Sequence, residues 1–415
     1  MCALLATGCA STAKDKHEQL RAELDTAIQQ AANYLESQQS EKGSWPSQTY
    51  GLFRDGIALT PHVLRSLATA DRNNDTMKQG FAFLGEQVNR TRSHPSRPSL
   101  SPAVQGPVYF IADTQQAVNH CPQQAHAKLS KIYAGLPRLQ IRDDEASTFA
   151  QEGGWGYWNR AFGGIPKGFT DFQLEFEHGK SSTPIFPNLS ANISATVYAL
   201  DSIPPPASYL TGHGSPPSPR YKRMIEAALR FAEKCQNHNS GDNRFDDGGF
   251  FFNPADDARN KGGAAGTDKH GYARFHSSGS STADGLRVLL RCHLSKQDPR
   301  VIAARDWLFE HFDPEHNPGT FNEGREVLRD AYYFYYAASV ADTFALLGQG
   351  PDNWSADLAT ALLQKQREDG SFANPFTDGK EDDPLIATPF ALRAMIACRD
   401  NLTQYGVCFA RHQQR

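Results

Sequence analysis

The sequence predicts an all-α fold in which about six helical hairpins close into two concentric rings, an α/α toroid. Three observations lead to this prediction. A short motif recurs at both ends of the chain, each time behind an apolar helical stretch. The predicted helices alternate between an amphipathic type and a type that is apolar nearly all round. Long connections rich in glycine and proline separate the helix pairs.

The recurring motif is a glutamine followed by a glycine and then an aromatic residue. Its two full copies are Gln39, Gly43 and Trp45 near the start and Gln366, Gly370 and Phe372 near the end. Partial copies stand at Gly153-Gly154-Trp155-Gly156 and Gly248-Gly249-Phe250. We expect the glutamine to bond the exposed amides of the following turn and the aromatic ring to pack on the helix it leaves. Trp45, Trp155 and Phe372 should therefore hold the ring together rather than touch a ligand.

Apolar residues at helical spacing predict the elements in order. The first amphipathic helix is expected at 17–38, where Leu20, Leu24, Ile28 and Leu35 share one face. Further helices are expected at 56–70, 75–90, 105–118, 123–135, 190–202, 220–238, 278–293, 298–312, 328–348, 352–367 and 385–398.

The two helix types assign the helices to the two rings. Residues Arg220 to Lys234 carry charge on one face, which suits an outer helix. Residues Ala331 to Leu347 are apolar nearly all round, with the single acid Asp342, and such a helix must be covered on every side. Closing the ring removes the exposed ends of an open array. We therefore expect one toroidal domain over residues 17–410.

Residues 1–16 are interpreted as a leader. The apolar run Ala3-Leu4-Leu5-Ala6-Thr7-Gly8 ends in small residues before Cys9, which resembles a bacterial lipoprotein processing site. On this hypothesis Cys9 becomes the lipidated amino terminus, and the protein is anchored in the bacterial cell envelope or periplasm. The alternative is a frayed tail without function, since no Lys or Arg precedes the run.

Charge and hydropathy restrict the partners. The formal net charge is -4 and no run is rich in Lys or Arg, so we expect no nucleic-acid partner. No apolar stretch approaches the roughly 20 residues of a membrane-spanning helix, so membrane contact is expected only through a lipid anchor. The sequence does not indicate an oligomeric state.

The motif resembles a known superfamily. The spacing from Tyr34 to Trp45 is similar to the Gln-Trp repeat of the squalene cyclases, oxidosqualene cyclases and prenyltransferases, and Ala361 to Phe372 is similar with Phe in place of Trp. Within this superfamily the stretch from Ser278 to Leu347 resembles bacterial squalene-cyclase-like envelope proteins. Its matching segments are Gly279-Ser280-Ser281-Thr282, Asp298-Pro299-Arg300, Asn317-Pro318-Gly319 and Tyr332 to Tyr336. The resemblance covers roughly residues 20–400 and implies the terpenoid-cyclase toroid.

The resemblance implies acids that this chain lacks. Class II terpene cyclases protonate a double bond with an Asp-x-Asp-Asp motif, which is absent here; the nearest acids are Asp284, Asp342 and Asp382-Asp383. Asp342 is the best candidate for a catalytic acid, although an isolated Asp in an apolar cavity tends to be neutral and weak. The alternative for Asp342 is a buried hydrogen-bonded carboxyl or one that faces outward.

No metal or cofactor motif is present either. The sequence has no Asp-rich magnesium motif pair, no Asp-x-Cys zinc core and no His-Glu-x-x-His, so we predict no metal and no cofactor. Residues 242–268 concentrate aspartates among glycines, which could hold calcium but fits a solvated mobile loop better, because the spacing of a calcium loop is missing.

A stripe of polar aromatic residues suggests a ligand-binding wall. Tyr332, Tyr335, Tyr336, Ser339 and Thr343 fall on one face of the helix that carries Asp342. The wall could bind an apolar chain or stabilise a cation at the central cavity, and the alternative is that the rings simply fill the centre.

Three functions remain open at this point. The favoured one is an envelope-anchored toroid that binds an apolar small molecule or a peptide and has no cyclase activity. The second is a divergent terpenoid cyclase or prenyl-processing enzyme that uses Asp342. The third is a polysaccharide lyase or another glycan-active toroid, in which Trp155, Tyr157 and Trp158 stack on sugars. The third predicts an open, polar groove bearing arginines, whereas the first two predict a closed apolar pocket.

Overall fold

The computed structural model describes residues 2–90, 98–100, 104, 106–125, 127–141, 152–157, 191–211 and 213–412. The side chains of residues 2–15, 89–90, 98–100, 210 and 404–412 are not part of that description. Trp158 lies outside the described residues.

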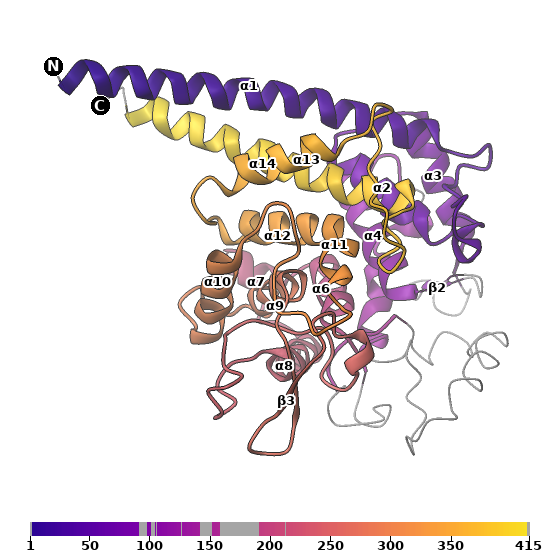
Figure 1. Ribbon diagram of the computed structural model, residues 1–415. Helices are drawn as coiled ribbons and strands as arrows, with labels where there is room; N and C mark the ends of the chain where they lie inside the picture. The colour runs from indigo at the N-terminus through magenta and orange to yellow at the C-terminus, as the bar shows by residue number, and fades with distance from the viewer. Residues whose placement is uncertain are drawn as a thin grey trace.

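Helices on the outside of the molecule alternate with helices on the inside (Figure 1). The outer elements are α1 (Cys2–Ser37), α3 (Asp75–Glu86), the 3₁₀ helix η3 (Ile132–Arg138), α8 (Pro219–Cys235), α10 (Pro299–His311) and α13 (Trp354–Lys365). The inner helices are α2 (Leu59–Thr69), α4 (Pro107–His120), α6 (Ile193–Ser202), α9 (Gly279–Arg291), α12 (Tyr333–Leu347) and α14 (Pro384–His412). Each inner helix packs against the next, and α14 packs back against α2. The ring is therefore closed, and the predicted toroid of six hairpins is confirmed.

Local sequence signals explain where the helices begin and end. The side chains of Asn74, Asn192 and Ser218 accept hydrogen bonds from the first turns of α3, α6 and α8. Proline occupies the first turn of α4, α8 and α10, where no backbone N–H is needed. Helix α12 ends at Gly348, whose φ of 70° suits a residue without a side chain.

The structure departs from the predicted elements in several places. Helices α1 and α14 extend beyond the predicted 17–38 and 385–398, to Cys2 and His412. The α-helix expected at 123–135 is replaced by the 3₁₀ helices η2 (Ala127–Leu129) and η3, the second of which contains Pro137, a residue without a backbone N–H to donate. The helix expected at 328–348 is divided at Tyr332 into α11 (Val327–Ala331) and α12. Short elements that were not predicted lie in the connections. They are η1 (Gly51–Phe53), α7 (Ala207–Thr211), η6 (Asp257–Arg259) and the antiparallel strand pairs β1 (Val88–Arg90) with β2 (Pro98–Leu100) and β3 (Ala264–Thr267) with β4 (Ala273–Phe275).

The repeated motif joins three helices at once. At the first copy, the Gln39 side chain donates hydrogen bonds to the carbonyl of Gly43 in its own turn and to the carbonyl of Thr76 in the next outer helix. The backbone N–H of Trp45 donates to the hydroxyl of Thr60 on the following inner helix. We expected the glutamine to accept hydrogen bonds from backbone N–H groups of the turn. Instead, its side-chain NH₂ group donates to two backbone carbonyls.

Three further positions around the ring repeat this arrangement. Gln140, Gln236 and Gln366 each donate to the carbonyl of the motif glycine and to a carbonyl of the next outer helix, namely Met224, Arg300 and Ala27. The backbone N–H groups of Trp155, Phe250 and Phe372 donate to the hydroxyls of Thr196, Thr282 and Thr388 on inner helices. The partial copies seen in the sequence therefore belong to complete copies whose glutamines stand further back in the chain.

The motif glycine is required by both its conformation and its surroundings. Gly153 has φ = 92°, and a Cβ atom there would lie 2.1 Å from the carbonyl oxygen of Ala227 in α8. Gly43, Gly248 and Gly370 show the same two features against α3, α10 and α1. A side chain at any of these positions would push an outer helix away from the turn.

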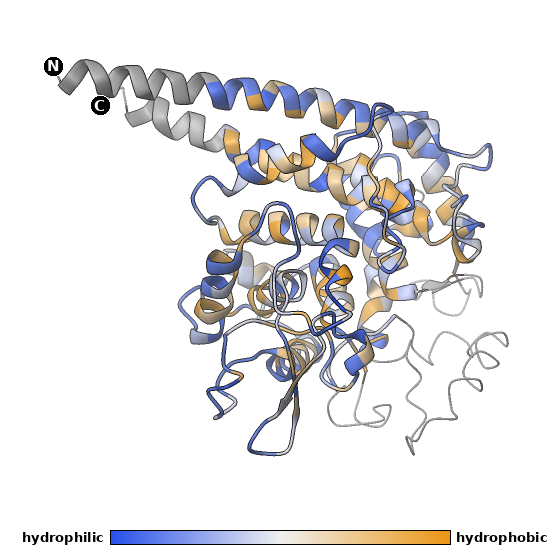
Figure 2. Cartoon of the chain, viewed as in Figure 1, coloured by the Kyte–Doolittle hydropathy of each residue, from blue (hydrophilic) through white to orange (hydrophobic). Residues whose placement is uncertain are grey.

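Helix α1 runs without a break from Cys2 to Ser37, through the residues interpreted as a leader. It lies beside α14, and both chain ends lie on the same side of the molecule (Figure 1). Hydrophilic residues cover much of α1, whereas the described part of α14 is mostly hydrophobic (Figure 2). Among the described residues, no helix combines the length and apolar character needed to cross a membrane. The side chain of Cys9 lies outside the described residues, so its lipidation stays a prediction.

Candidate functional site at the centre of the ring

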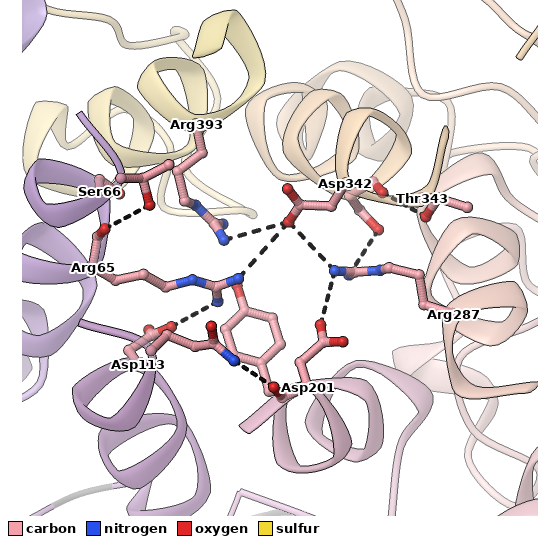
Figure 3. Close-up of polar contacts among 12 residues, drawn as sticks. Arg65, Ser66, Asp113, Asp201, Arg287, Asp342, Thr343 and Arg393 are labelled. Atoms are coloured by element: carbon pink, nitrogen blue, oxygen red, sulfur yellow. Dashed lines mark hydrogen bonds and ion pairs between the residues drawn. The ribbon is translucent and has the colours of Figure 1, made fainter. Parts of the chain in front are cut away.

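Every inner helix contributes at least one charged side chain to the centre of the ring. We call this set the axial belt: Arg65 on α2, Asp113 on α4, Asp201 on α6, Asp284 and Arg287 on α9, Asp342 on α12 and Arg393 on α14. Figure 3 shows belt residues from all six helices pointing toward one another. The inner helices are therefore not uniformly apolar as the sequence suggested. The expectation of an apolar wall around the centre of the ring is wrong where the axial belt lies.

Asp342 stands among three arginines. Its Oδ2 atom lies 3.3 Å from Nη1 of Arg287, 3.5 Å from Nη1 of Arg393 and 3.8 Å from Nη2 of Arg65 (Figure 3). Its side chain remains 28 % exposed, whereas those of Arg287 and Arg393 are 4 % and 5 % exposed. Asp342 is thus not the isolated acid in an apolar wall that we expected. Three guanidinium groups stand around its Oδ2 atom.

Asp284 is fully buried and surrounded by donors. Oδ2 accepts 2.6 Å hydrogen bonds from the hydroxyls of Ser194 and Tyr335, and Oδ1 accepts bonds from the Ser339 hydroxyl at 2.5 Å and from Nη2 of Arg287 at 2.9 Å. Four donors satisfy the acceptor sites of a carboxylate. Asp284 therefore ties together side chains from α6, α9 and α12.

The remaining belt acids are also paired with cations. Burial alone would raise the pKa of Asp113, but the contacts with His62 and the charge of Arg65, 2.9 Å away, lower it to about 2. Burial opposes ionisation of Asp201 too, yet Arg287 at 3.0 Å and Arg291 at 2.7 Å lower its pKa. These carboxyl groups are ionised at neutral pH, which suits hydrogen-bond acceptors and not proton donors.

Aromatic side chains surround the axis near the amino-terminal ends of the inner helices. The rings of Tyr109 and Tyr157 stack with centroids 5.4 Å apart, and Tyr335 meets Phe390 edge to face at 5.3 Å. All four side chains are only half-buried although they lie inside a closed ring. Together with the 28 % exposure of Asp342, this shows that side chains near the axis keep some contact with solvent.

The residues of the predicted wall divide between two sides of α12. Tyr335 and Ser339 face the axis, where both bond Asp284. Tyr336 is fully buried on another side, where its hydroxyl accepts from the N–H of Asp313 behind α10. Thr343 donates to the carbonyl of Ala283 in α9, and Tyr332 precedes the helix and donates to the carbonyl of Asp378. Part of the predicted wall therefore faces the axis, and the rest packs against neighbouring segments.

Some hydrogen-bonding capacity at the axis is unfilled. Among the described residues, the Arg393 guanidinium makes no hydrogen bond, and its Nε is enclosed without a partner. It packs on the ring of Phe390, 5.4 Å from the centroid. Oδ1 of Asp342 likewise accepts no hydrogen bond from the part of the chain that the structure describes. Arg393, which meets Asp342 through an ion pair but makes no hydrogen bond, thus lies beside the unfilled Oδ1 of that carboxyl.

The other acids singled out in the sequence have structural partners. Asp382 accepts a 2.5 Å bond from the hydroxyl of Tyr50, and Asp383 accepts bonds from Ser47 and from the first turn of α14. In the acidic stretch 242–268, Asp242 pairs with Arg244, Asp257 pairs with Arg325, and Asp268 accepts bonds from its own turn. Within the described ranges, no group of three or more His, Cys, Asp or Glu residues is arranged to hold a metal.

Sequence reasoning found Asp342 but missed the rest of the belt as a site. Arg65, Asp113 and Asp201 are each the single Asp, Glu, Lys or Arg residue of an otherwise uncharged helix, whereas Arg287 and Arg393 share α9 and α14 with other charges. The signal that could have identified the first three is the one applied to Asp342, an unpaired charge on a helix that has no polar face.

Comparison with known proteins supports the fold. No protein-family model and no curated protein matches the sequence. Among solved structures, the chain is similar to a variant of the type II terpene cyclase MstE from Scytonema with its product merosterolic acid A. The TM-score is 0.54 at 12 % identity, over 92 % of this chain and 99 % of that chain. A variant of the same cyclase with its substrate geranylgeranyl dihydroxybenzoate gives a TM-score of 0.53 at 10 % identity over the same shares. A glycosidase variant aligns with a TM-score of 0.48 at 9 % identity, over 92 % of this chain and 98 % of that chain. This TM-score is too low to support any conclusion. The chain therefore has the α/α-toroid fold of squalene-cyclase-like proteins such as the type II terpene cyclases.

Proposed function

We propose that the protein binds a polyhydroxylated small molecule, such as a sugar unit of a glycan, at the axis of the ring. The observation that carries this proposal is the pairing of unfilled groups at the axis, the donors of Arg393 beside the free Oδ1 of Asp342. A hydroxyl group both donates and accepts, so adjacent hydroxyls can satisfy the two side chains together.

The aromatic residues complete the suggested site. Tyr109, Tyr157, Tyr335 and Phe390 offer partly exposed rings next to the belt. Ligand sites commonly combine apolar ring faces with a few fixed polar groups that set orientation. A sugar presents both surfaces, because its C–H face is apolar and its edge carries hydroxyls. The axis also has the polar, arginine-bearing character that the glycan hypothesis required.

The belt argues against the two other hypotheses. Protonating an alkene requires a carboxyl group that still carries its proton, whereas Asp113 and Asp201 are ionised at neutral pH and Asp342 is engaged by three arginines. A purely apolar ligand would leave the charged groups at the axis without water or partners, which is unfavourable. MstE acts on an isoprenoid substrate, but at this level of identity its chemistry does not transfer to the belt.

Saturation-transfer NMR and calorimetry test the proposal. The probes are a panel of neutral monosaccharides and disaccharides, with farnesol as the apolar comparison. The informative variant is Arg393→Gln, which removes the free donors but leaves Asp342 facing two arginines, so that no charge is stranded. Arg399→Gln is the matched control, because Arg399 lies on the same helix but pairs at the surface with Asp400.

We expect a sugar to bind the wild-type protein and Arg399→Gln with equal affinity. Arg393→Gln should bind it at least about tenfold more weakly, a loss of about 1.4 kcal/mol. Binding of farnesol without binding of any sugar would refute the proposal, as would sugar binding that Arg393→Gln leaves unchanged.

A further inference from the structure

A second feature near the axis is a buried lysine without a polar partner. Lys261 lies between η6 and β3, and its side chain belongs to the buried set at 7 % exposure. Among the described residues, its ammonium group makes no hydrogen bond and no ion pair, whereas buried lysines are normally paired. Its Nζ is not one of the fully enclosed unpartnered atoms of that part of the chain, so it keeps some contact with solvent.

Three aromatic rings surround the amine. Nζ of Lys261 lies 4.8 Å from the ring centroid of Tyr332, 5.2 Å from that of Phe252 and 5.9 Å from that of Tyr335. Tyr335 is also one of the rings around the axis, where it meets Phe390, so the cage shares one side chain with the axial region. The rings provide flat apolar surfaces on which a small molecule can pack beside the amine.

The backbone holds Lys261 in place on both sides. Arg325 donates a 2.6 Å hydrogen bond to the carbonyl of Asn260, and the Asn260 side chain itself accepts two backbone N–H bonds. Gly262 packs so closely that a Cβ there would lie 2.4 Å from the carbonyl oxygen of Thr320. The lysine is therefore built into the cage and is not a surface chain that folds inward by chance.

Burial favours the neutral amine, whereas the ring faces and the nearby acids favour the ammonium. Burial lowers the pKa of Lys261 to about 8, and the negative charges of Asp284 and Glu381 oppose this shift only in part. The other titratable groups facing the amine are the tyrosines of the cage, whose own pKa values are raised by burial. At pH 7.5 roughly a quarter of such a lysine is uncharged, against about 0.1 % for an ordinary lysine. Only the uncharged amine is a nucleophile.

We propose that Lys261 is a covalent binding site for small aldehydes or ketones. The amine nitrogen attacks the carbonyl carbon and forms a carbinolamine. The two amine protons and the carbonyl oxygen then leave as water, and a C=N bond replaces the C=O bond. The reaction is reversible and needs no oxidant or reductant. It does not depend on sugar binding at the axial belt.

Trapping with benzaldehyde and cyanoborohydride tests this site. Benzaldehyde is uncharged and flat, and the reductant converts the imine into a stable amine that peptide mass spectrometry can locate. The internal control is Lys269, an exposed lysine in the turn between β3 and β4. We expect Lys261 to be labelled at least about tenfold faster than Lys269 at pH 7.5 because more of it is neutral.

The pH profile and two variants complete the design. The labelling rate of Lys261 should reach half its maximum near pH 8, whereas that of Lys269 should still rise at pH 9. Lys261→Arg should abolish the fast label, and Lys269→Arg should leave it unchanged. In denaturant both lysines should react equally, which shows that both peptides are detected. Labelling of native Lys261 at or below the rate of Lys269 would overturn the proposal.

Discussion

The side chain of Gln366 donates a 2.9 Å hydrogen bond to the carbonyl of Ala27, which joins the turn after the last outer helix to the first helix of the chain. The same amide donates to the carbonyl of Gly370 within its own turn. Three other glutamines make the corresponding pair of bonds within the described part of the chain. Gln366 is the copy that closes the ring.

Loss of the closing glutamine should destabilise the whole protein. Gln366→Ala leaves two carbonyls without their donor, and we expect the free energy of unfolding to fall by about 1–3 kcal/mol in urea denaturation. Gln39→Ala should cost a similar amount, because it breaks the equivalent bonds elsewhere in the ring. Gln364→Ala, at an exposed position two residues earlier, is the control. Equal stability of the Gln366 and Gln364 variants would contradict this role.

A methyl group at a motif glycine should be far more costly than one at an ordinary turn glycine. Gly153→Ala combines a φ of 92° with a Cβ 2.1 Å from a backbone oxygen, and we expect a loss of more than about 3 kcal/mol or failure to fold. Gly271→Ala has a similar φ of 84° but open space around the new Cβ, so only about 1 kcal/mol of backbone strain is expected. Urea denaturation of the two variants checks the difference. Equal losses would show that conformation alone, and not the contact with α8, requires the glycine.

The Asp113 pair should make stability depend on pH. The folded-state pKa of about 2 lies below the unfolded value, so the stabilisation is complete above about pH 4 and is lost as the pH falls toward 2. Asp113→Asn should therefore lower the free energy of unfolding by about 2 kcal/mol at pH 7. The difference in free energy of unfolding between Asp113→Asn and the wild type should become smaller in urea titrations below pH 4. The exposed Asp75, which pairs with Lys78, provides the control Asp75→Asn, for which the gap should be much smaller. A gap that stays constant from pH 7 to pH 3 would rule out this ionisation as its source.

Asp284 should be the most sensitive acid of the belt. Asp284→Asn replaces acceptors of four hydrogen bonds by a group that is half donor, and a loss of about 3 kcal/mol is expected. Tyr335→Phe removes one of the four donors and should cost about 1 kcal/mol. Thermal and urea denaturation measure both. A larger loss of stability in Tyr335→Phe than in Asp284→Asn would contradict the central role of the carboxylate in this network.

The sequence was sufficient for the fold because the signals that define it are local and repeated. The spacing of apolar residues placed the inner and outer helices, and the copies at Gln39 and Gln366 indicated the array. The glutamines of the middle copies could not be recognised, because Gln140 and Gln236 stand 13 and 12 residues before their glycines in place of four. Pro137 alone was a sign that the segment before it would not continue as an α-helix.

The candidate site was harder to predict because it depends on contacts between distant helices. The partners of Arg287, for example, come from three inner helices and include Asp201, 86 residues away. No sequence spacing relates such residues, so Asp342 was read as a lone acid when its three arginines lay on α2, α9 and α14. The partial exposure around the axis also follows only from how far apart the inner helices stand.

Ring closure changes how this protein can begin to unfold. In a linear array the terminal units have one neighbour and fray first, but here every hairpin has a neighbour on each side. Opening any one hairpin breaks the interfaces with both of its neighbours and the glutamine hydrogen bonds across them. Amide hydrogen exchange in the inner helices should accordingly proceed through a single opening of the whole toroid, with no gradient from α2 to α14.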